Sequence, residues 1–221
     1  MEIKSRLESS IDDIDTVCVA VARPNKDLKQ QHIGFFYFDG DMVNFLHLAK
    51  HNKLVNESPD DKYLWLDISL DPINKIHFAT YCATVYEQNK MGIPYGFDLD
   101  GTDFSEDGHF LKKNQYMGLT CGSFVVQVFR AQGYEIIDLN NWPSRQEDKT
   151  WQELILSILR KYVSMEYFNY QDDKIKEGIA RFKPEEVAVA ATLPNPPYGL
   201  DEIKKEVAVL FNKIVVNSRI G

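Results

Sequence analysis

The sequence predicts an α+β fold, in which strands near the N-terminus are followed mainly by helices. Two short strands at 32–38 and 42–48 flank Asp39-Gly40, a dipeptide favoured in two-residue hairpin turns. Later segments instead repeat apolar residues at helical spacing. We therefore expect an antiparallel sheet packed against helices. A single domain spans 1–221 in this interpretation, with a C-terminal helical extension from about 145.

Two further strands are expected beside the hairpin. The apolar run at 17–21 follows an acidic stretch, and 63–68 follows a polar loop. Asp67 lies near the end of the second run. It is either a third catalytic carboxylate or, more commonly, a residue of the turn that follows.

Four helices are expected along the rest of the chain. The first covers 73–88, the second opens at Cys121 and stops near Gly133, the third covers 148–165 and the fourth covers 200–214. The predicted apolar stripe of the first consists of Ile76, Ala79, Ala83 and Tyr86, with Cys82 beside it. That of the third consists of Trp151, Leu154, Ile155, Ile158, Leu159 and Tyr162.

Two connecting segments carry weaker signals. A short strand is expected at 134–137. The acidic segment 98–109 resembles a calcium loop, but Gly101 is fourth from Asp98, whereas an EF-hand loop has glycine at its sixth position. We interpret it as a solvated loop at the rim of a cleft.

Composition excludes several classes of partner. The 221-residue chain has a net charge of -8, which argues against binding to nucleic acid or to an anionic membrane surface. No apolar run approaches the length of a membrane span, and the first residues lack a secretory signal. Three widely spaced cysteines indicate neither a disulfide framework nor a zinc site. A cytoplasmic protein without metal or cofactor is expected, with export without a cleavable signal as a second setting.

Cys121 is the first candidate for chemistry. Thr120 is a suitable N-cap, so Cys121 is expected at a helix start, where the N-terminus favours the thiolate. That environment predicts a nucleophile near neutral pH. The alternative is a buried cysteine that serves as a small apolar residue.

His32 and His47 are the second candidate feature. If Asp39-Gly40 forms the turn, counting outward pairs Phe36 with Val43 and His32 with His47. One imidazole would take the proton from Cys121 and the other would orient it. That face of the hairpin is then expected to pack toward the start of the Cys121 helix.

Together these motifs resemble the permuted branch of the NlpC-type peptidase superfamily, which has a circularly permuted papain-like fold and includes lecithin–retinol acyltransferase-like proteins. The resemblance rests on His32-Ile33-Gly34, on His47-Leu48-Ala49 and on the run from Thr120 to Val125. Gly92-Ile93-Pro94-Tyr95 is similar to a Gly-x-Pro-Tyr segment of bacterial members. The resemblance extends over 32–133. It implies an antiparallel sheet packed against the helix that carries the nucleophile.

The resemblance implies a role for each residue. Cys121 would be the nucleophile, His32 the general base and His47 the third, orienting residue. Gln115 lies six residues before Cys121, where papain-like enzymes place an oxyanion glutamine. The competing oxyanion donors are the backbone N–H of Cys121 and the side chains of Tyr95 and Tyr116.

The expected activity is that of a cysteine hydrolase, which cleaves an amide in a peptide, a peptidoglycan stem or a protein conjugate. An ester or lipid acyl hydrolase or acyltransferase is the alternative within this class. A catalytically inactive binding or immunity module on the same fold is the rival from another class. A metal site of His32, His47 and Cys121 is a further rival that lacks a fourth ligand. The substrate and the oligomeric state are left open.

Overall fold

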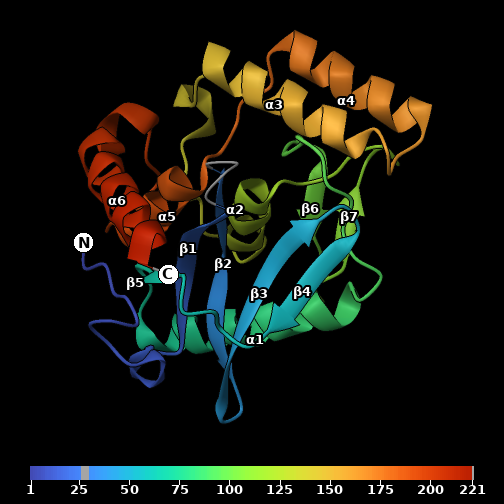
Figure 1. Ribbon diagram of the computed structural model, residues 1–221. Coiled ribbons are helices and arrows are strands. Elements are labelled where there is room, and N and C mark those ends of the chain that lie inside the picture. The colour runs from blue at the N-terminus through green and yellow to red at the C-terminus, as the bar shows by residue number, and fades with distance from the viewer. Residues whose placement is uncertain (26–29, 221) are drawn as a thin grey trace.

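The computed structural model describes residues 1–25 and 30–220. Its central feature is an antiparallel five-stranded sheet with the strand order β4-β3-β2-β1-β5 (Figure 1). The strands are β1 (Val17–Asn25), β2 (Gln30–Asp39), β3 (Met42–Lys50), β4 (Lys53–Glu57) and β5 (Leu64–Asp67). A separate hairpin consists of β6 (Thr102–Phe104) and β7 (Phe110–Lys112). The predicted α+β class is confirmed.

Six α-helices are present in the described part of the chain. They are α1 (Pro72–Gln88), α2 (Cys121–Ala131), α3 (Gln146–Leu159), α4 (Met165–Glu177), α5 (Pro184–Thr192) and α6 (Leu200–Ile220). Short 3-10 turns are η1 (Ile11–Asp13) and η2 (Leu139–Asn141). Helices α1, α2 and α5 pack against one sheet face, whereas α3 and α4 form an outlying pair (Figure 1).

The two faces of the sheet carry cores of different size. The larger core joins Ile33, Phe35 and Leu46 to apolar side chains of the helices, including Phe124 of α2. The smaller core on the opposite face contains Phe36, Phe45, Tyr63 and Trp65, together with Ile11 and Ile14 from the N-terminal segment. Strand residues alternate between faces, so neighbours in sequence belong to different cores.

The β2–β3 hairpin differs from its predicted register. Gly40 and Asp41 form the turn, and the pairs include Asp39 with Met42 and Phe36 with Phe45. Gly40 has a φ of +65° in the first central position, where type II′ turns place glycine. Each β2 residue therefore faces a β3 residue two positions later than predicted. Because a shift of two preserves alternation, His32 and His47 still share one face.

Two predicted helices have different apolar faces from those expected. In α1, Phe78, Cys82 and Val85 are buried, whereas Ile76 is 57% exposed. The predicted helix at 148–165 is two helices, because Ser164 caps a new helix at Met165. Three residues of its predicted stripe are exposed: Leu154, Ile158 and Tyr162.

Tertiary contacts determine the structure of segment 134–137 and the surroundings of Asp98 and Asp67. The expected strand at 134–137 is only an isolated bridge between Ile137 and Tyr198. Asp98 is buried rather than solvated, because it accepts hydrogen bonds from the Gly118 N–H and the Gln171 amide. Asp67 accepts from Lys4 Nζ at 2.8 Å, which agrees with the structural interpretation of this carboxylate.

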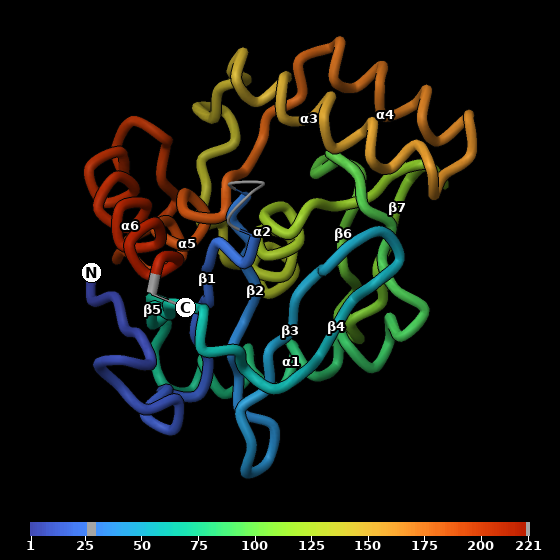
Figure 2. The backbone as a smooth tube through the Cα atoms, in the orientation of Figure 1, coloured from blue at the N-terminus to red at the C-terminus, as the bar shows by residue number. Residues whose placement is uncertain are grey.

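The ends of the described chain lie near each other. Lys213 on α6 donates to the Ile3 carbonyl at 3.0 Å, so the N-terminal segment runs beside the last helix (Figure 2). No helix in the described residues combines the length and the apolar character that a membrane crossing needs.

Candidate functional site

Cys121 is the first residue of α2, as predicted. The Thr120 hydroxyl accepts from the Ser123 N–H at 3.1 Å, and the Ser123 hydroxyl accepts from the Thr120 N–H at 2.8 Å. This capping box satisfies N–H groups that otherwise have no partner at a helix start. The Cys121 residue is 5% exposed.

Close packing holds the start of α2 in place. A Cβ atom on Gly122 would overlap the carbonyl oxygen of Phe182, so only glycine permits this approach. On another side, the Leu119 N–H donates to the Pro94 carbonyl at 2.9 Å. The segment Gly92-Ile93-Pro94-Tyr95 thus lies beside the residues that lead into Cys121.

The environment of the Cys121 sulfur favours the neutral thiol. Burial is the largest influence and raises the thiol pKa. The Ile33 backbone N–H, the Arg181 guanidinium and the N–H groups of the helix start act in the opposite direction without reversing it. The helix start thus acts toward the thiolate, as predicted, but burial outweighs it in the resting protein. A base must remove the proton if this sulfur is to react.

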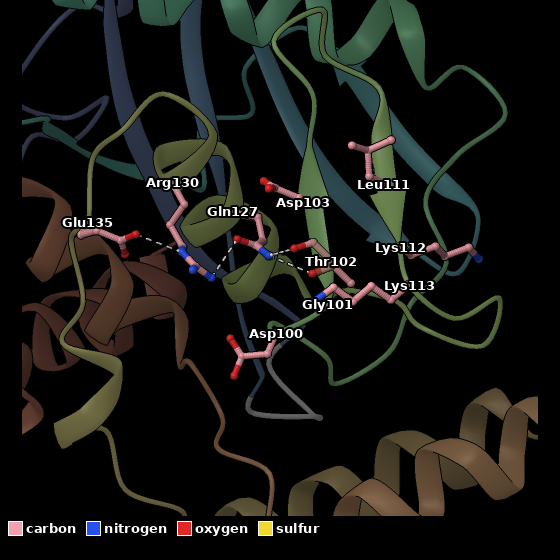
Figure 3. Close-up of a pocket in the computed structure, with 10 residues that line it drawn as sticks. All are labelled: Asp100, Gly101, Thr102, Asp103, Leu111, Lys112, Lys113, Gln127, Arg130 and Glu135. Atoms are coloured by element: carbon pink, nitrogen blue, oxygen red, sulfur yellow. Dashed lines mark hydrogen bonds and ion pairs between the residues drawn. The ribbon is translucent and has the colours of Figure 1, made fainter.

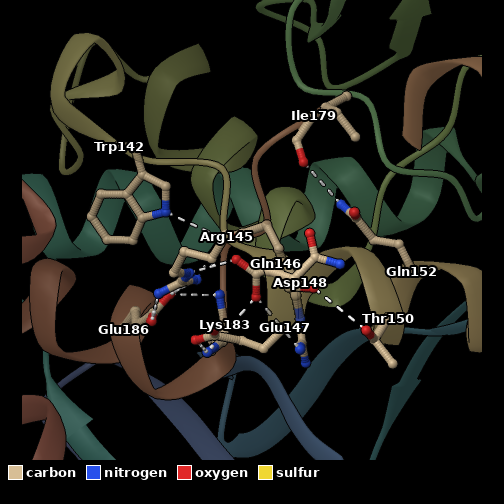
Figure 4. Close-up of polar contacts among 11 residues, drawn as sticks. Trp142, Arg145, Gln146, Glu147, Asp148, Thr150, Gln152, Ile179, Lys183 and Glu186 are labelled. Atoms are coloured by element: carbon tan, nitrogen blue, oxygen red, sulfur yellow. Dashed lines mark hydrogen bonds and ion pairs between the residues drawn. The ribbon is translucent and has the colours of Figure 1, made fainter. Parts of the chain in front are cut away.

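A polar cluster holds Arg181 near the start of α2. Arg145 Nε donates to Asp148 at 2.5 Å, and the same guanidinium donates to Glu186 (Figure 4). Its remaining nitrogen donates to the Arg181 carbonyl at 3.3 Å. The Arg181 guanidinium itself stacks 3.6 Å from the centroid of the Trp151 ring. Sequence reasoning missed Arg181, because nothing in the local pattern links residue 181 to residue 121.

His32 and His47 form a hydrogen-bonded pair at one end of the hairpin. His32 Nε2 lies 2.8 Å from His47 Nδ1, and His47 Nε2 lies 3.1 Å from a carboxylate oxygen of Glu57. The His47 ring stacks on Phe45, with ring centroids 4.2 Å apart. The His32 Nδ1 makes no hydrogen bond to any residue that the structure describes.

Gly34 permits this pairing. The observed register places His47 across from Gly34 rather than across from His32. A Cβ atom on Gly34 would lie 2.7 Å from His47 Cβ and 2.7 Å from the Phe45 ring. Because Gly34 has no side chain, the His47 ring has the space to lie over this position and reach His32.

Both imidazoles have lowered pKa values, which favours their neutral forms at pH 7. Burial, followed by the proximity of His47, lowers the pKa of His32 to about 3. Burial also lowers the pKa of His47, although Glu57 opposes this change. His32 is thus available as a proton acceptor, and its protonated form is disfavoured in the resting site.

The thiol and the histidines approach β2 from different sides. His32 and His47 share the face of Phe36 and Phe45, whereas α2 packs on the opposite face. The expectation that the histidine face packs toward α2 is wrong, because alternation sends Ile33, not His32, toward the helix. Within the described residues, no hydrogen bond joins Cys121 to His32. The Ile33 N–H nevertheless favours negative charge on this sulfur, and Ile33 is the next residue after His32.

Tyr63 interacts with both parts of the candidate site, the histidine pair and Cys121. Its ring centroid is 6.4 Å from that of His32. Burial raises the Tyr63 pKa, and Cys121 is the next largest cause of that rise. Tyr63 also lines a cavity of about 290 Å³ together with both histidines.

The three side chains considered as oxyanion donors occupy different environments. Tyr95 is buried, and Cys121 contributes to the rise of its pKa. Gln115 is exposed, and its backbone carbonyl accepts from Lys112 Nζ at 2.7 Å. Tyr116 is half-buried, with its ring near those of Tyr167 and Tyr170. Of these side chains, Tyr95 is the one with an electrostatic link to the thiol.

A larger cavity lies away from the histidines and Cys121. It measures about 690 Å³ and is bounded by the β6–β7 hairpin and the C-terminal half of α2 (Figure 3). Asp100 and Asp103 line it, so the acidic segment does reach the rim of a depression. Arg130 and Glu135 form an ion pair of 3.3 Å within the lining. The lining contains no histidine or cysteine.

The described residues contain no cluster of three or more histidine, cysteine or acidic side chains suited to a metal ion. The chain matches no protein-family model, no curated protein and no solved structure.

Proposed function

We propose that this protein is a cysteine hydrolase that cleaves an amide bond through a thioester. One observation carries the proposal: the backbone N–H of Ile33, one residue from His32, lowers the pKa of the Cys121 thiol at the start of α2. His32 Nδ1 has no hydrogen-bond partner among the residues that the structure describes, while the other ring nitrogen of His32 is held by His47. A nucleophile, an adjacent base and an orienting group are the parts that nucleophilic catalysis needs.

The reaction has two acyl-transfer steps. The Cys121 sulfur attacks the amide carbon, while its proton passes to His32 Nδ1. The tetrahedral intermediate collapses as the carbon–nitrogen bond breaks, and His32 returns the proton to the departing amine. Water then attacks the thioester and gives a proton to His32. The carbon–sulfur bond breaks, the acid leaves, and the Cys121 thiolate recovers the proton.

Several groups favour the charge that develops during this sequence. The α2 N-terminus, the Ile33 N–H and the Arg181 guanidinium all stabilise negative charge at the sulfur. The Cys121 N–H is the donor we assign to the oxyanion, with Tyr95 as the neighbouring side chain. The 290 Å³ cavity beside the histidines is where we place part of the substrate.

Approach of the two reacting groups is the step this mechanism requires. Hydrogen bonds of a catalytic site commonly tighten only when substrate is bound. In this protein the thiol and His32 must meet near the start of β2, where Ile33 follows His32. An amide carbonyl placed between them would complete the arrangement.

The test is covalent labelling of the folded protein with a peptidyl acyloxymethyl ketone, followed by mapping of the modified residue by mass spectrometry. We expect modification at Cys121 alone, since Cys18 and Cys82 are fully buried. His32→Ala should slow labelling by on the order of 100-fold, the usual contribution of a general base. His77→Ala, which changes an exposed histidine on α1, should leave the rate unchanged.

Two results would overturn the proposal. One is equal modification of all three cysteines in folded protein, a pattern expected only after denaturation. The other is labelling of Cys121 at the same rate in wild type and His32→Ala. A parallel panel of peptide amides and acyl esters distinguishes an amidase from an ester or lipid acyl hydrolase.

A further inference from the structure

Glu57 continues the chain of polar contacts beyond the two histidines. It ends β4 and pairs with Phe45 across the β3–β4 ladder, which places it diagonally from His47. The carboxylate side chain is 57% exposed, and its oxygen lies 3.1 Å from His47 Nε2. The hydrogen-bonded series therefore runs from the exposed carboxylate through the buried His47 to the half-buried His32.

The charge of Glu57 fixes the direction of each hydrogen bond. An ionised carboxylate only accepts, so His47 Nε2 must carry the proton in this contact. Burial lowers the pKa of His47 and so favours its neutral form, in which Nδ1 has a lone pair and accepts. His32 Nε2 must then donate across the 2.8 Å contact. A neutral His32 with its proton on Nε2 has an unprotonated Nδ1.

We propose that Glu57 is a positioning residue that selects the tautomers of His47 and His32 and so presents a bare Nδ1 on His32. The histidine contact alone does not decide this direction. With the opposite polarity, His47 Nδ1 would donate to His32 Nε2, and Nδ1 of His32 would carry a proton. That tautomer could not accept a proton from a thiol at Nδ1.

The inference about tautomers stands on hydrogen-bond geometry, and only its catalytic consequence rests on the proposed function. Lys53, on the same strand as Glu57, is the other charged group that influences His47, and it disfavours protonation of His47. Removal of Glu57 thus leaves His47 beside a cation, with no acceptor for its Nε2 proton.

The test is ¹⁵N nuclear magnetic resonance of the histidine side chains at pH 7, which distinguishes protonated from unprotonated ring nitrogens. In wild type we expect the proton on Nε2 in both histidines. Glu57→Ala should populate the opposite tautomer. Glu57→Gln retains an acceptor oxygen at the same position and should preserve the wild-type pattern. Glu87→Ala, at an exposed glutamate on α1, is the matched control and should also preserve it.

Labelling of Cys121 supplies the catalytic readout. Glu57→Ala should slow it about tenfold or more, because a wrong tautomer disables the base, and Glu57→Gln should restore it to within a few-fold. The inference is overturned if wild-type His32 carries its proton on Nδ1, or if Glu57→Ala leaves both tautomers unchanged. If the tautomers respond as expected while wild-type Cys121 does not label, Glu57 has its positioning role and the hydrolase proposal fails.

Discussion

The buried state of His32 predicts a measurable dependence of stability on pH. Its pKa is about 3 in the folded protein, against an ordinary value of 6.5 for an unfolded chain. Above pH 6.5 the His32 imidazole is neutral in both the folded and the unfolded protein, so titration of His32 does not reduce the free energy of unfolding. As the pH falls below 6.5, the unfolded state takes up a proton and the folded state does not. Stability is then lost progressively until the pH reaches about 3.

The magnitude follows from this window. Each pH unit within it costs about 1.4 kcal/mol, so His32 should account for about 2 kcal/mol of lost stability between pH 7 and pH 5. His32→Gln removes the titrating group but keeps an N–H donor for His47. The free energy of unfolding of this variant should therefore fall by about 2 kcal/mol less than that of wild type over the same range.

Urea denaturation at pH 7 and pH 5 measures this difference. Asp98 and Glu185 have raised pKa values, so they favour the folded state as the pH falls, but they are common to both proteins and cancel. His77→Gln serves as a control for removal of an exposed imidazole. Equal pH dependence in wild type and His32→Gln would refute the conclusion that His32 is held neutral by its surroundings.

Two glycines give further predictions from close packing. Gly34→Ala would force a Cβ against the Leu46 carbonyl and His47, so we expect a loss of about 3 kcal/mol in urea denaturation and altered His47 resonances. Gly122→Ala would strike the Phe182 carbonyl and should cost a similar amount, about 3 kcal/mol, with slower labelling of Cys121. Gly199→Ala, at a glycine without a positive φ whose nearest neighbour is the flexible Glu202 carboxylate at 3.3 Å, is the comparison for both. Wild-type stability with unchanged His47 resonances would contradict the prediction for Gly34→Ala. Wild-type stability with unchanged Cys121 labelling would contradict the prediction for Gly122→Ala.

Local sequence signals predicted the elements around the site but not their exact pairing. The capping residues of α2 are neighbours in sequence, so Thr120 could be identified as the N-cap directly. The hairpin turn was displaced by one residue, because a glycine with positive φ fits either central position of a primed turn. Alternation survived this error, which is why the two histidines still meet.

The parts that sequence reasoning missed depend on contacts between distant segments. β4 carries few large apolar residues, so Glu57 had no strand pattern to mark it, and only the ladder with β3 brings it to His47. Arg181 reaches Cys121 through packing of the 180–182 segment against Gly122. The exposed side of α3 was mispredicted because an apolar stripe shows helical spacing without showing what covers it.

In the proposed mechanism, the resting protonation states of Cys121 and His32 indicate where activation must come from. Burial raises the pKa of Cys121 and lowers that of His32, so proton transfer between them is unfavourable before substrate binds. An ion pair formed by transfer would have to be stabilised by groups already in place. Arg181 and the Ile33 N–H act on the sulfur, and Glu57 acts on the histidine pair through His47. Because these groups stabilise the charged pair more than the neutral one, their contribution is realised during bond formation rather than at rest, which is the condition for lowering a barrier.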